Sequence, residues 1–172
     1  LDAGLVVQNK NGGLYDKFRN RLMLPVIDTR GDVVAFGSRV LDKSEPKYMN
    51  SSETPVYSKR RVLYGLNLAK KSKRPNIILC EGNLDIVTLH QAGFDNAVAS
   101  MGTALTVEQT RLLSRFTKEL VLCYDNDNAG KIATERALQI LNGSEFSVKV
   151  LQLPRRLVDG EYIKQDADDF IK

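Results

Sequence analysis

From Asn76 onward, the sequence alternates short apolar runs with segments of helical periodicity. The apolar runs are Ile77–Cys80, Ala97–Ser100, Leu120–Tyr124 and Val148–Leu153. The helical segments between them are Leu84–Ala92, Val107–Phe116 and Ala129–Leu141. Short apolar strands that alternate with helices over short connections form a mostly parallel sheet covered on both faces. We therefore expect an α/β domain over residues 76–172.

Residues that commonly begin or end helices stand at the expected boundaries. Gly93 and Gly143 follow two of the helical segments, where glycine readily adopts the left-handed backbone of a C-cap. Thr106 precedes another segment and is followed three residues later by Gln109, the pattern of a capping box. These residues support the expected helix limits.

Residues 1–75 lack this alternating pattern and are expected to form a smaller α+β subdomain. Two β-prone runs, Arg21–Asp28 and Val33–Val40, lie on either side of a turn-like stretch and predict an antiparallel hairpin. Val62–Lys71 has the pattern of a short helix with a lysine-rich end, which suits the helix dipole.

Two further segments of this half are expected to lack regular structure. Residues 42–59 are polar and contain Pro46 and Pro55, so they are expected to be mostly irregular. Residues 1–14 end in Asn11-Gly12-Gly13, which indicates a loop.

The net charge of +4 hides an asymmetry between the two halves. The first 76 residues carry 15 Lys and Arg against 7 Asp and Glu, whereas the remaining residues carry 10 against 14. A basic half favours a polyanion such as nucleic acid, and an acidic half is where divalent cations would collect. Ordinary solvated surfaces would give the same counts, so only the positions of the charges can distinguish binding surfaces from solvated ones.

Several classes of protein are disfavoured by what the sequence contains. The apolar runs are far shorter than the roughly 20 residues of a membrane helix. Cys80 and Cys123 end apolar runs without a further Cys or His at ligand spacing, so we expect buried reduced thiols, no zinc site and a cytoplasmic location. His90 is expected to be an ordinary helix residue. The sequence has neither a phosphate-binding P-loop nor a nucleophile elbow.

Acidic residues follow two of the predicted strands. Glu81 and Asp85 come after the first strand of the α/β domain, and Asp125 and Asp127 come after the third. Because ligands of parallel α/β sheets bind at the carboxyl ends of the strands, we expect these carboxylates to converge. Mg²⁺ prefers such oxygen ligands, together with water and substrate phosphates. The pattern therefore indicates a magnesium site suited to phosphoryl transfer.

Purely structural roles are open for the same residues. Asp127 is in position to cap the helix that starts near Ala129, and Asp85 falls in the first turn of its helix, where the dipole favours an acid. A calcium-binding EF-hand loop is excluded, because its fifth and twelfth positions would be Ala129 and Arg136. A third acidic group, at 166–169, is weak evidence by itself.

These motifs together resemble a known family. Glu81-Gly82-x-x-Asp85, then Ala99-Ser100-Met101-Gly102-Thr103-Ala104, then Asp125-x-Asp127-x-Ala129-Gly130, is similar to a Toprim domain, which bacterial primases, topoisomerases and some nucleases share. The upstream motifs resemble the catalytic core of bacterial DnaG-type primases: Tyr15–Val26, Val34–Arg39, Pro46–Thr54 and Leu63–Leu66. The resemblance extends from about Tyr15 to the C-terminus.

The resemblance implies roles for individual residues. Glu81, Asp125 and Asp127 would bind catalytic Mg²⁺, for which Mn²⁺ would substitute, and Asp85 would support them. Asp166 and Asp168 would be further acidic positions of the metal site. Residues of the basic subdomain would face nucleotides or the template–primer hybrid: Lys47, Tyr48, Asn50 and Lys59, with Arg39, Arg19 and Arg21 as looser candidates. Ordinary solvated surface is the alternative for these basic residues.

Three positions depart from the family pattern without removing a carboxylate. Asn83 stands where the family usually has an aromatic residue, Asn126 replaces the glycine of Asp-Gly-Asp, and Ala167 replaces the proline of Asp-Pro-Asp. The resemblance also implies missing parts, namely the zinc-binding module, the start of the core and the C-terminal helicase-binding region. Since the chain starts at Leu1 rather than Met, we expect a piece of a longer protein.

The leading hypothesis is therefore a DNA primase core, which makes short RNA primers on single-stranded DNA from ribonucleoside triphosphates at a bacterial replication fork. The replicative helicase and single-strand-binding protein would be partners through regions outside this chain. A Toprim nuclease and a catalytically silent nucleic-acid-binding fragment are the alternatives. A topoisomerase is disfavoured, because no catalytic-tyrosine region is evident.

Overall fold

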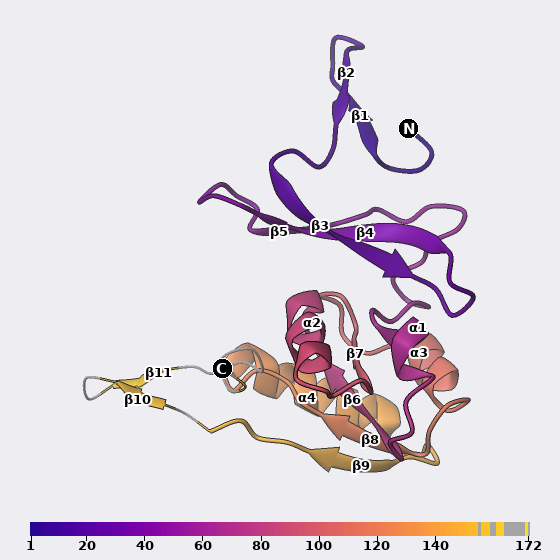
Figure 1. Cartoon of the computed structure of the whole chain (residues 1–172), viewed down its shortest axis with the longest axis vertical. Coiled ribbons are helices and arrows are strands. Elements are labelled where there is room, and N and C mark those ends of the chain that lie inside the picture. Colours follow the sequence, from indigo (N-terminus) through magenta and orange to yellow (C-terminus); the bar gives the residue numbers. More distant parts are fainter. Residues whose placement is uncertain (155, 159–160, 164–170, 172) are drawn as a thin grey trace.

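The computed structural model describes residues 1–154, 156–158, 161–163 and 171. It contains two antiparallel sheets in the N-terminal half, a parallel sheet after residue 75 that is covered by helices, and a C-terminal hairpin (Figure 1). The hairpin pairs β10 (Arg156–Val158) with β11 (Glu161–Ile163). Within these ranges, none of the helices combines the length and apolar character that a bilayer crossing requires.

The parallel sheet has the strand order β7-β6-β8-β9. Its strands are β6 (Asn76–Cys80), β7 (Ala97–Ala99), β8 (Glu119–Leu122) and β9 (Ser147–Val150). All three neighbouring pairs are parallel, with Leu79 opposite Leu122 at the carboxyl end of the central pair. The expected mostly parallel sheet is confirmed, although the last strand ends at Val150 rather than at Leu153.

Helices cover both faces of this sheet. They are α1 (Leu66–Ala69), α2 (Asn83–Gln91), α3 (Val107–Leu113) and α4 (Asn128–Leu141). Because alternate residues of a strand point to opposite faces, Leu79 packs with α1, α3 and α4, whereas its neighbour Cys80 packs with α2. Burial on both faces explains why the strands are continuous apolar runs.

The N-terminal half consists of two short antiparallel sheets. One pairs β1 (Val6–Gln8) with β2 (Leu14–Asp16), and the other has the order β3-β4-β5. Its strands are β3 (Arg21–Ile27), β4 (Val33–Val40) and β5 (Tyr48–Asn50). The hairpin expected from the two β-prone runs is confirmed as β3 and β4.

Three local expectations for this half were wrong or incomplete. The stretch 11–13 is the turn of the β1–β2 hairpin, so residues 1–14 are not simply a loop. The segment 42–59 contains β5, which pairs with β4. The helix expected over 62–71 is only α1, because Gly65 has a φ of 80° at its start and Tyr64 exchanges backbone hydrogen bonds with Ala99 of β7.

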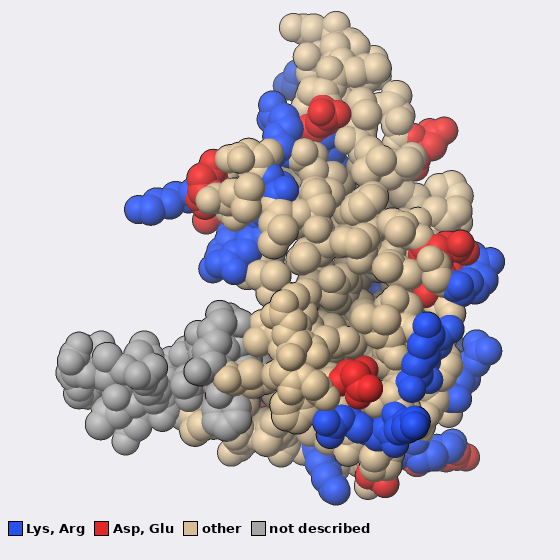
Figure 2. Space-filling view, in the orientation of Figure 1, with Lys and Arg blue, Asp and Glu red and all other residues tan. Residues whose placement is uncertain are grey.

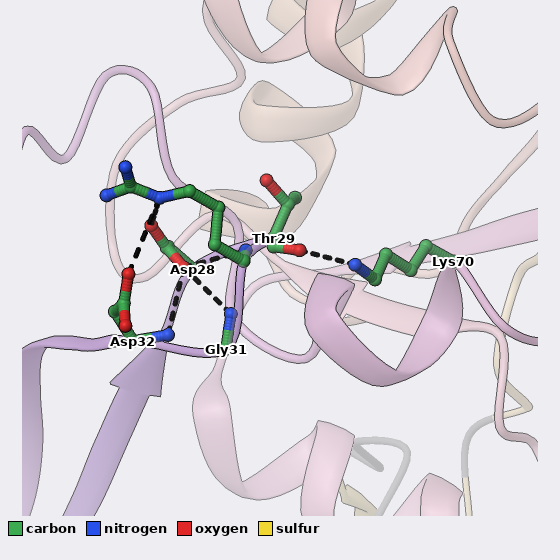
Figure 3. Close-up of polar contacts among 6 residues, drawn as sticks. Asp28, Thr29, Gly31, Asp32 and Lys70 are labelled. Atoms are coloured by element: carbon green, nitrogen blue, oxygen red, sulfur yellow. Dashed lines mark hydrogen bonds and ion pairs between the residues drawn. The ribbon is translucent and has the colours of Figure 1, made fainter.

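A polar turn ties the antiparallel sheet to α1. The carboxylate of Asp28 accepts hydrogen bonds from the backbone N–H groups of Arg30, Gly31 and Asp32 at 2.8–3.1 Å, which closes the β3–β4 turn (Figure 3). The ammonium group of Lys70 donates to the carbonyl oxygen of Thr29 in that turn. Residues separated by about forty positions are thereby held together.

Gln109 on α3 joins a second pair of distant segments. Its side chain is fully buried, and its Nε2 donates to the carbonyl oxygens of Lys59 and Val62, each at 2.9 Å. Its Oε1 accepts from the backbone N–H of Thr106 at 3.1 Å, so the expected capping box is confirmed.

We predict that Gln109→Ala lowers the free energy of unfolding by about 3 kcal/mol, because two carbonyl groups and one N–H lose their partner in a buried place. Gln139→Ala, at an exposed position of α4, is the control and is expected to change it by less than about 0.5 kcal/mol. Urea unfolding followed by circular dichroism measures both. Equal effects of the two substitutions would contradict the stabilising role assigned to the buried hydrogen bonds of Gln109.

Candidate metal and nucleotide site

Two acidic residues, Glu81 and Asp125, lie side by side at the carboxyl edge of the parallel sheet. Glu81 directly follows β6, and Asp125 follows β8 by three residues. The backbone N–H of Cys123 donates to the carbonyl oxygen of Leu79 at 2.9 Å, so the pairing continues beyond the last register pair. Oε1 of Glu81 then accepts from the backbone N–H of Asp125 at 3.3 Å. Of the four acids expected to converge, all of which the structure describes, Glu81 and Asp125 are joined by this bond, whereas no three of them are grouped closely enough to hold an ion together.

The backbone at Asp125 is held by a close approach of α4. A Cβ atom built on Gly130 would lie 2.0 Å from the carbonyl oxygen of Asp125, so only glycine fits there. The side chain of Asp127 caps the same helix, because its Oδ1 accepts from the backbone N–H of Gly130 at 2.8 Å. The capping role considered for Asp127 is thus present.

Asp85 also performs the structural role considered for it. It stands in the first turn of α2, and its Oδ2 accepts from the backbone N–H of Gly82 at 3.1 Å. This bond fixes the turn between β6 and α2 directly beside Glu81. Asp85 is therefore placed to support Glu81.

A cavity of about 360 Å³, here called the central cavity, separates these acids from the antiparallel sheet. Glu81, Asp85 and Asp125 line one side of it. The other side includes Lys47, Tyr48 and Asn50, from the segment that ends in β5. An anionic ligand that carries a divalent cation would find both kinds of charge within one cavity.

The rim of this cavity depends on close contact between the two halves. A Cβ atom on Gly37 of β4 would lie 2.3 Å from Nδ2 of Asn83, the first residue of α2. Nδ2 of Asn50 donates to the carbonyl oxygen of Met101 at 3.1 Å, and the hydroxyl of Tyr57 lies 3.7 Å from the sulfur of Met101. These contacts hold the basic side against the acidic side.

Asn83 is a site residue that sequence reasoning recorded only as a departure from the family. It lines the central cavity, and its buried Oδ1 has no hydrogen-bond partner among the described residues. The nearby glycine of Phe36-Gly37-x-Arg39 was the signal that something approaches β4 closely at this point.

Tyr48 lies among cations on the surface of the antiparallel sheet. Its ring is about half exposed, with the guanidinium carbon of Arg39 at 5.7 Å and the ammonium nitrogen of Lys47 at 5.6 Å from the ring centroid. Arg39 and Tyr48 are register partners on β4 and β5. The structure thus brings together three of the nucleic-acid candidates.

A second group of basic residues lines a cavity of about 640 Å³ between the β1–β2 hairpin and residues 44–46, here called the basic cavity. It includes Lys17, Arg19 and Arg21. Nη1 of Arg21 is buried without a hydrogen-bond partner in the described part of the chain, and Arg19 lies over the ring of Tyr15 at 5.1 Å. Several Lys and Arg side chains gather on this side of the N-terminal half (Figure 2).

Lys17 was missed by sequence reasoning, although it stands in the motif that contains Arg19 and Arg21. Burial, together with the charge of Lys59, lowers its pKa below the ordinary lysine value. The four cations Lys17, Lys59, Arg19 and Arg21 therefore belong to neighbouring surfaces, where a polyanion would relieve their mutual repulsion.

Three other titratable side chains close to Glu81 are buried, namely Tyr124, Cys80 and Cys123. Burial and the negative charge of Glu81 raise the pKa of the Tyr124 phenol, which therefore stays protonated. Cys80 and Cys123 are buried free thiols, as expected, and their mutual hydrogen bond and burial raise the pKa of Cys80. His90 contacts the carbonyl oxygen of Ala97 through Nε2 at 2.9 Å, an ordinary helix-to-strand contact.

The arrangement fits Mg²⁺ held by few protein ligands. Among the described residues, no group of three or more His, Cys, Asp and Glu side chains stands close enough to form a metal cage. Mg²⁺ commonly binds through one or two carboxylates and otherwise keeps water and substrate phosphates, so Glu81 and Asp125 suffice as a starting set. Asp166 and Asp168, the further expected ligands, lie outside the described residues.

Comparison with known proteins agrees with this geometry. Residues 1–70 match the family model of the DNA primase catalytic core, N-terminal domain, and residues 78–171 match the Toprim-like family model. The chain is 47% identical to a DNA primase from Clostridium acetobutylicum, over 100% of this chain and 28% of the relative. It is 42% identical to a DNA primase from Enterococcus faecalis, over 95% of this chain and 27% of that relative.

Solved structures show the same similarity. A DNA primase domain from Pseudomonas aeruginosa superposes with a TM-score of 0.87 at 41% identity, over 99% of this chain and 52% of that one. A DnaG primase catalytic domain bound to single-stranded DNA gives a TM-score of 0.84 at 41% identity, over 97% and 53%. The chain thus spans a little over a quarter of the curated relatives and about half of the solved cores.

We predict that Gly130→Ala displaces the backbone of Asp125 or the first turn of α4, because the added methyl group cannot occupy its position. The free energy of unfolding should fall by about 2 kcal/mol, and the backbone amide resonances of Glu81 and Asp125 should shift in a ¹H–¹⁵N NMR spectrum.

The matched control is Gly93→Ala, where a Cβ atom meets nothing within 4 Å but the φ of 87° is unfavourable for alanine. It should cost about 1 kcal/mol and leave the Glu81 and Asp125 resonances in place. Unchanged resonances of these two residues in Gly130→Ala would refute the steric account.

Proposed function

Because the chain belongs to the Toprim-like family and carries the N-terminal domain of a DNA primase catalytic core next to it, we propose that it is part of a DnaG-type DNA primase. The protein makes short RNA primers on single-stranded DNA by metal-dependent nucleotidyl transfer during DNA replication. The observation that carries this proposal is the meeting of Glu81 and Asp125 across one cavity from Lys47 and Tyr48. In this proposal, residues 1–75 contact the nucleotide and the nucleic acid, and residues 76–172 hold the metal ion.

In this proposal the acidic side of the central cavity holds the ion. Glu81 and Asp125 bind Mg²⁺ or, as a substitute, Mn²⁺, and Asp127, Asp166 and Asp168 are further acidic ligands. Asp85 keeps the turn after β6 in place for Glu81. A bound Mg²⁺ neutralises phosphate charge and lowers the pKa of the attacking 3′-hydroxyl group.

The basic side positions the nucleotide. Lys47 faces the phosphates, and Tyr48, which is already flanked by two cations, offers a stacking surface for a base. The amide nitrogen of Asn50 donates to Met101, so its carbonyl oxygen is the atom that remains to accept from a nucleotide hydroxyl or amine. These roles need no change in the fold.

The basic cavity suits the template strand. Lys17, Arg19 and Arg21 line it, and the charge of Lys59 acts on Lys17 from beside it. Together they offer a cationic surface that follows a phosphate backbone without reading its sequence. A solved DnaG catalytic domain to which the chain is 41% identical was determined with single-stranded DNA, which supports this template. The replicative helicase and single-strand-binding protein would act through parts of the protein outside these residues, in the bacterial cytoplasm.

We predict that Glu81→Gln weakens Mn²⁺ binding by at least about tenfold, because one of two converging carboxylates loses its charge. Glu135→Gln, an exposed position of α4, is the control and should bind as the unaltered chain does. Mn²⁺ titration followed by electron paramagnetic resonance measures both. Equal binding by both variants would reject the proposed ion site.

Reaction products separate the proposal from its alternatives. In the longest form of the protein that can be prepared, Glu81→Gln should abolish RNA primer synthesis from ribonucleoside triphosphates while leaving single-stranded DNA binding intact. Metal-dependent cutting of DNA without primers would indicate a nuclease. Salt-sensitive DNA binding that no metal-site change affects, with neither primers nor cleavage, would indicate a binding module.

A further inference from the structure

Glu81 lies between two cavities. One is the central cavity, and the second, of about 400 Å³, is here called the α4 cavity. Its walls are the loop after β7, at residues 100–104, and one side of α4, with Glu81 and Tyr124 between them. Glu81 and Gly102 line both cavities, so the two are separated by little more than these residues. The primase assignment uses the central cavity and the basic cavity and gives the α4 cavity no role.

One cation faces the α4 cavity. The helix residues that line it are Ala129, Ile132, Ala133 and Arg136, whose spacing places them on one face of α4. Arg136 is exposed, and no carboxylate of the described residues pairs with it. An exposed guanidinium group that is not paired with a carboxylate can bind two phosphate oxygens in a bidentate manner.

The opposite wall is a preformed and strained loop. Met101 and Gly102 have φ values of 63° and 72°, and the left-handed conformation is uncommon for a residue such as Met101. The hydroxyl groups of Ser100 and Thr103 donate to each other's carbonyl oxygens at 2.7 and 2.9 Å, and Asn50 and Tyr57 hold Met101 from the basic side. Strain that the surroundings maintain in this way is typical of functional sites.

Nucleotidyl transfer requires two substrates on opposite sides of one ion site. A bond forms between the 3′-oxygen of the growing strand and the α-phosphorus of the incoming nucleotide, while the bond to the diphosphate breaks and diphosphate leaves. If the nucleotide occupies the central cavity, with its cations, the end of the growing strand must approach Glu81 from elsewhere. The α4 cavity is the neighbouring space that reaches Glu81 and offers a cation.

We propose that the α4 cavity binds the last phosphodiester of the strand being extended and that Arg136 is its positioning residue. The inference rests on the proposed primase function. Arg136 contacts the non-reacting phosphate and so sets the direction from which the 3′-hydroxyl approaches the ion held beside Glu81. The apolar side chains Ile132 and Ala133 give the terminal sugar a dry surface.

The test measures binding of an RNA–DNA hybrid with a recessed RNA 3′ end, labelled with fluorescein, in the presence of Ca²⁺. Arg136→Ala should weaken hybrid binding about tenfold, and Arg136→Lys should recover part of it. Lys131→Ala, an exposed cation on α4 that does not line the cavity, is the control and should change nothing. Mn²⁺ binding, single-stranded DNA binding and thermal stability should be the same in all variants.

In extension assays, Arg136→Ala should raise the KM for the primer end about tenfold and leave the KM for the ribonucleotide unchanged. Hybrid binding by Arg136→Ala equal to that of Lys131→Ala would overturn the proposal. Loss of Mn²⁺ binding in Arg136→Ala would also overturn it. The same holds if Arg136→Ala changes only the inhibition of extension by inorganic diphosphate, because that result would assign the cavity to the leaving group. Failure of the unaltered protein to bind Mn²⁺ would count against the primase function instead.

Discussion

Everything proposed for this chain depends on the parallel pairing of β6 with β8. Because the two strands run in the same direction, the residues that follow them emerge at one edge, and Glu81 accepts a hydrogen bond from the backbone of Asp125 although 43 residues separate them in the sequence. Gly130 permits α4 to press against that backbone. Without this register, the acids would be unrelated surface charges.

The second requirement is that the basic half stays against this edge. Asn50 and Tyr57 contact Met101 of the loop after β7, and Gly37 leaves space for Asn83 at the start of α2. These contacts couple the shape of the proposed ion site to the position of the side chains proposed to face the nucleotide. Two halves of opposite charge therefore form one site rather than two separate surfaces.

Periodicity and local motifs predicted the parallel sheet, its helices, the Thr106–Gln109 capping box and the strand-end position of the acids, because all of these depend on neighbours in sequence. They missed β5 and the β1–β2 hairpin, since three-residue strands carry little periodicity and exist through their partners. Arg136 and Lys17 were missed for a related reason. Their neighbours are supplied by tertiary structure, as are the distant carbonyl partners of Gln109.

The most direct measurement of the central claim is the anomalous scattering of crystals soaked in Mn²⁺. The account predicts a peak at the carboxyl edge of β6 and β8, within about 2.2 Å of one carboxylate oxygen of Glu81 and one of Asp125. A peak that touches neither residue, or the absence of any peak at this edge of the sheet, would contradict it.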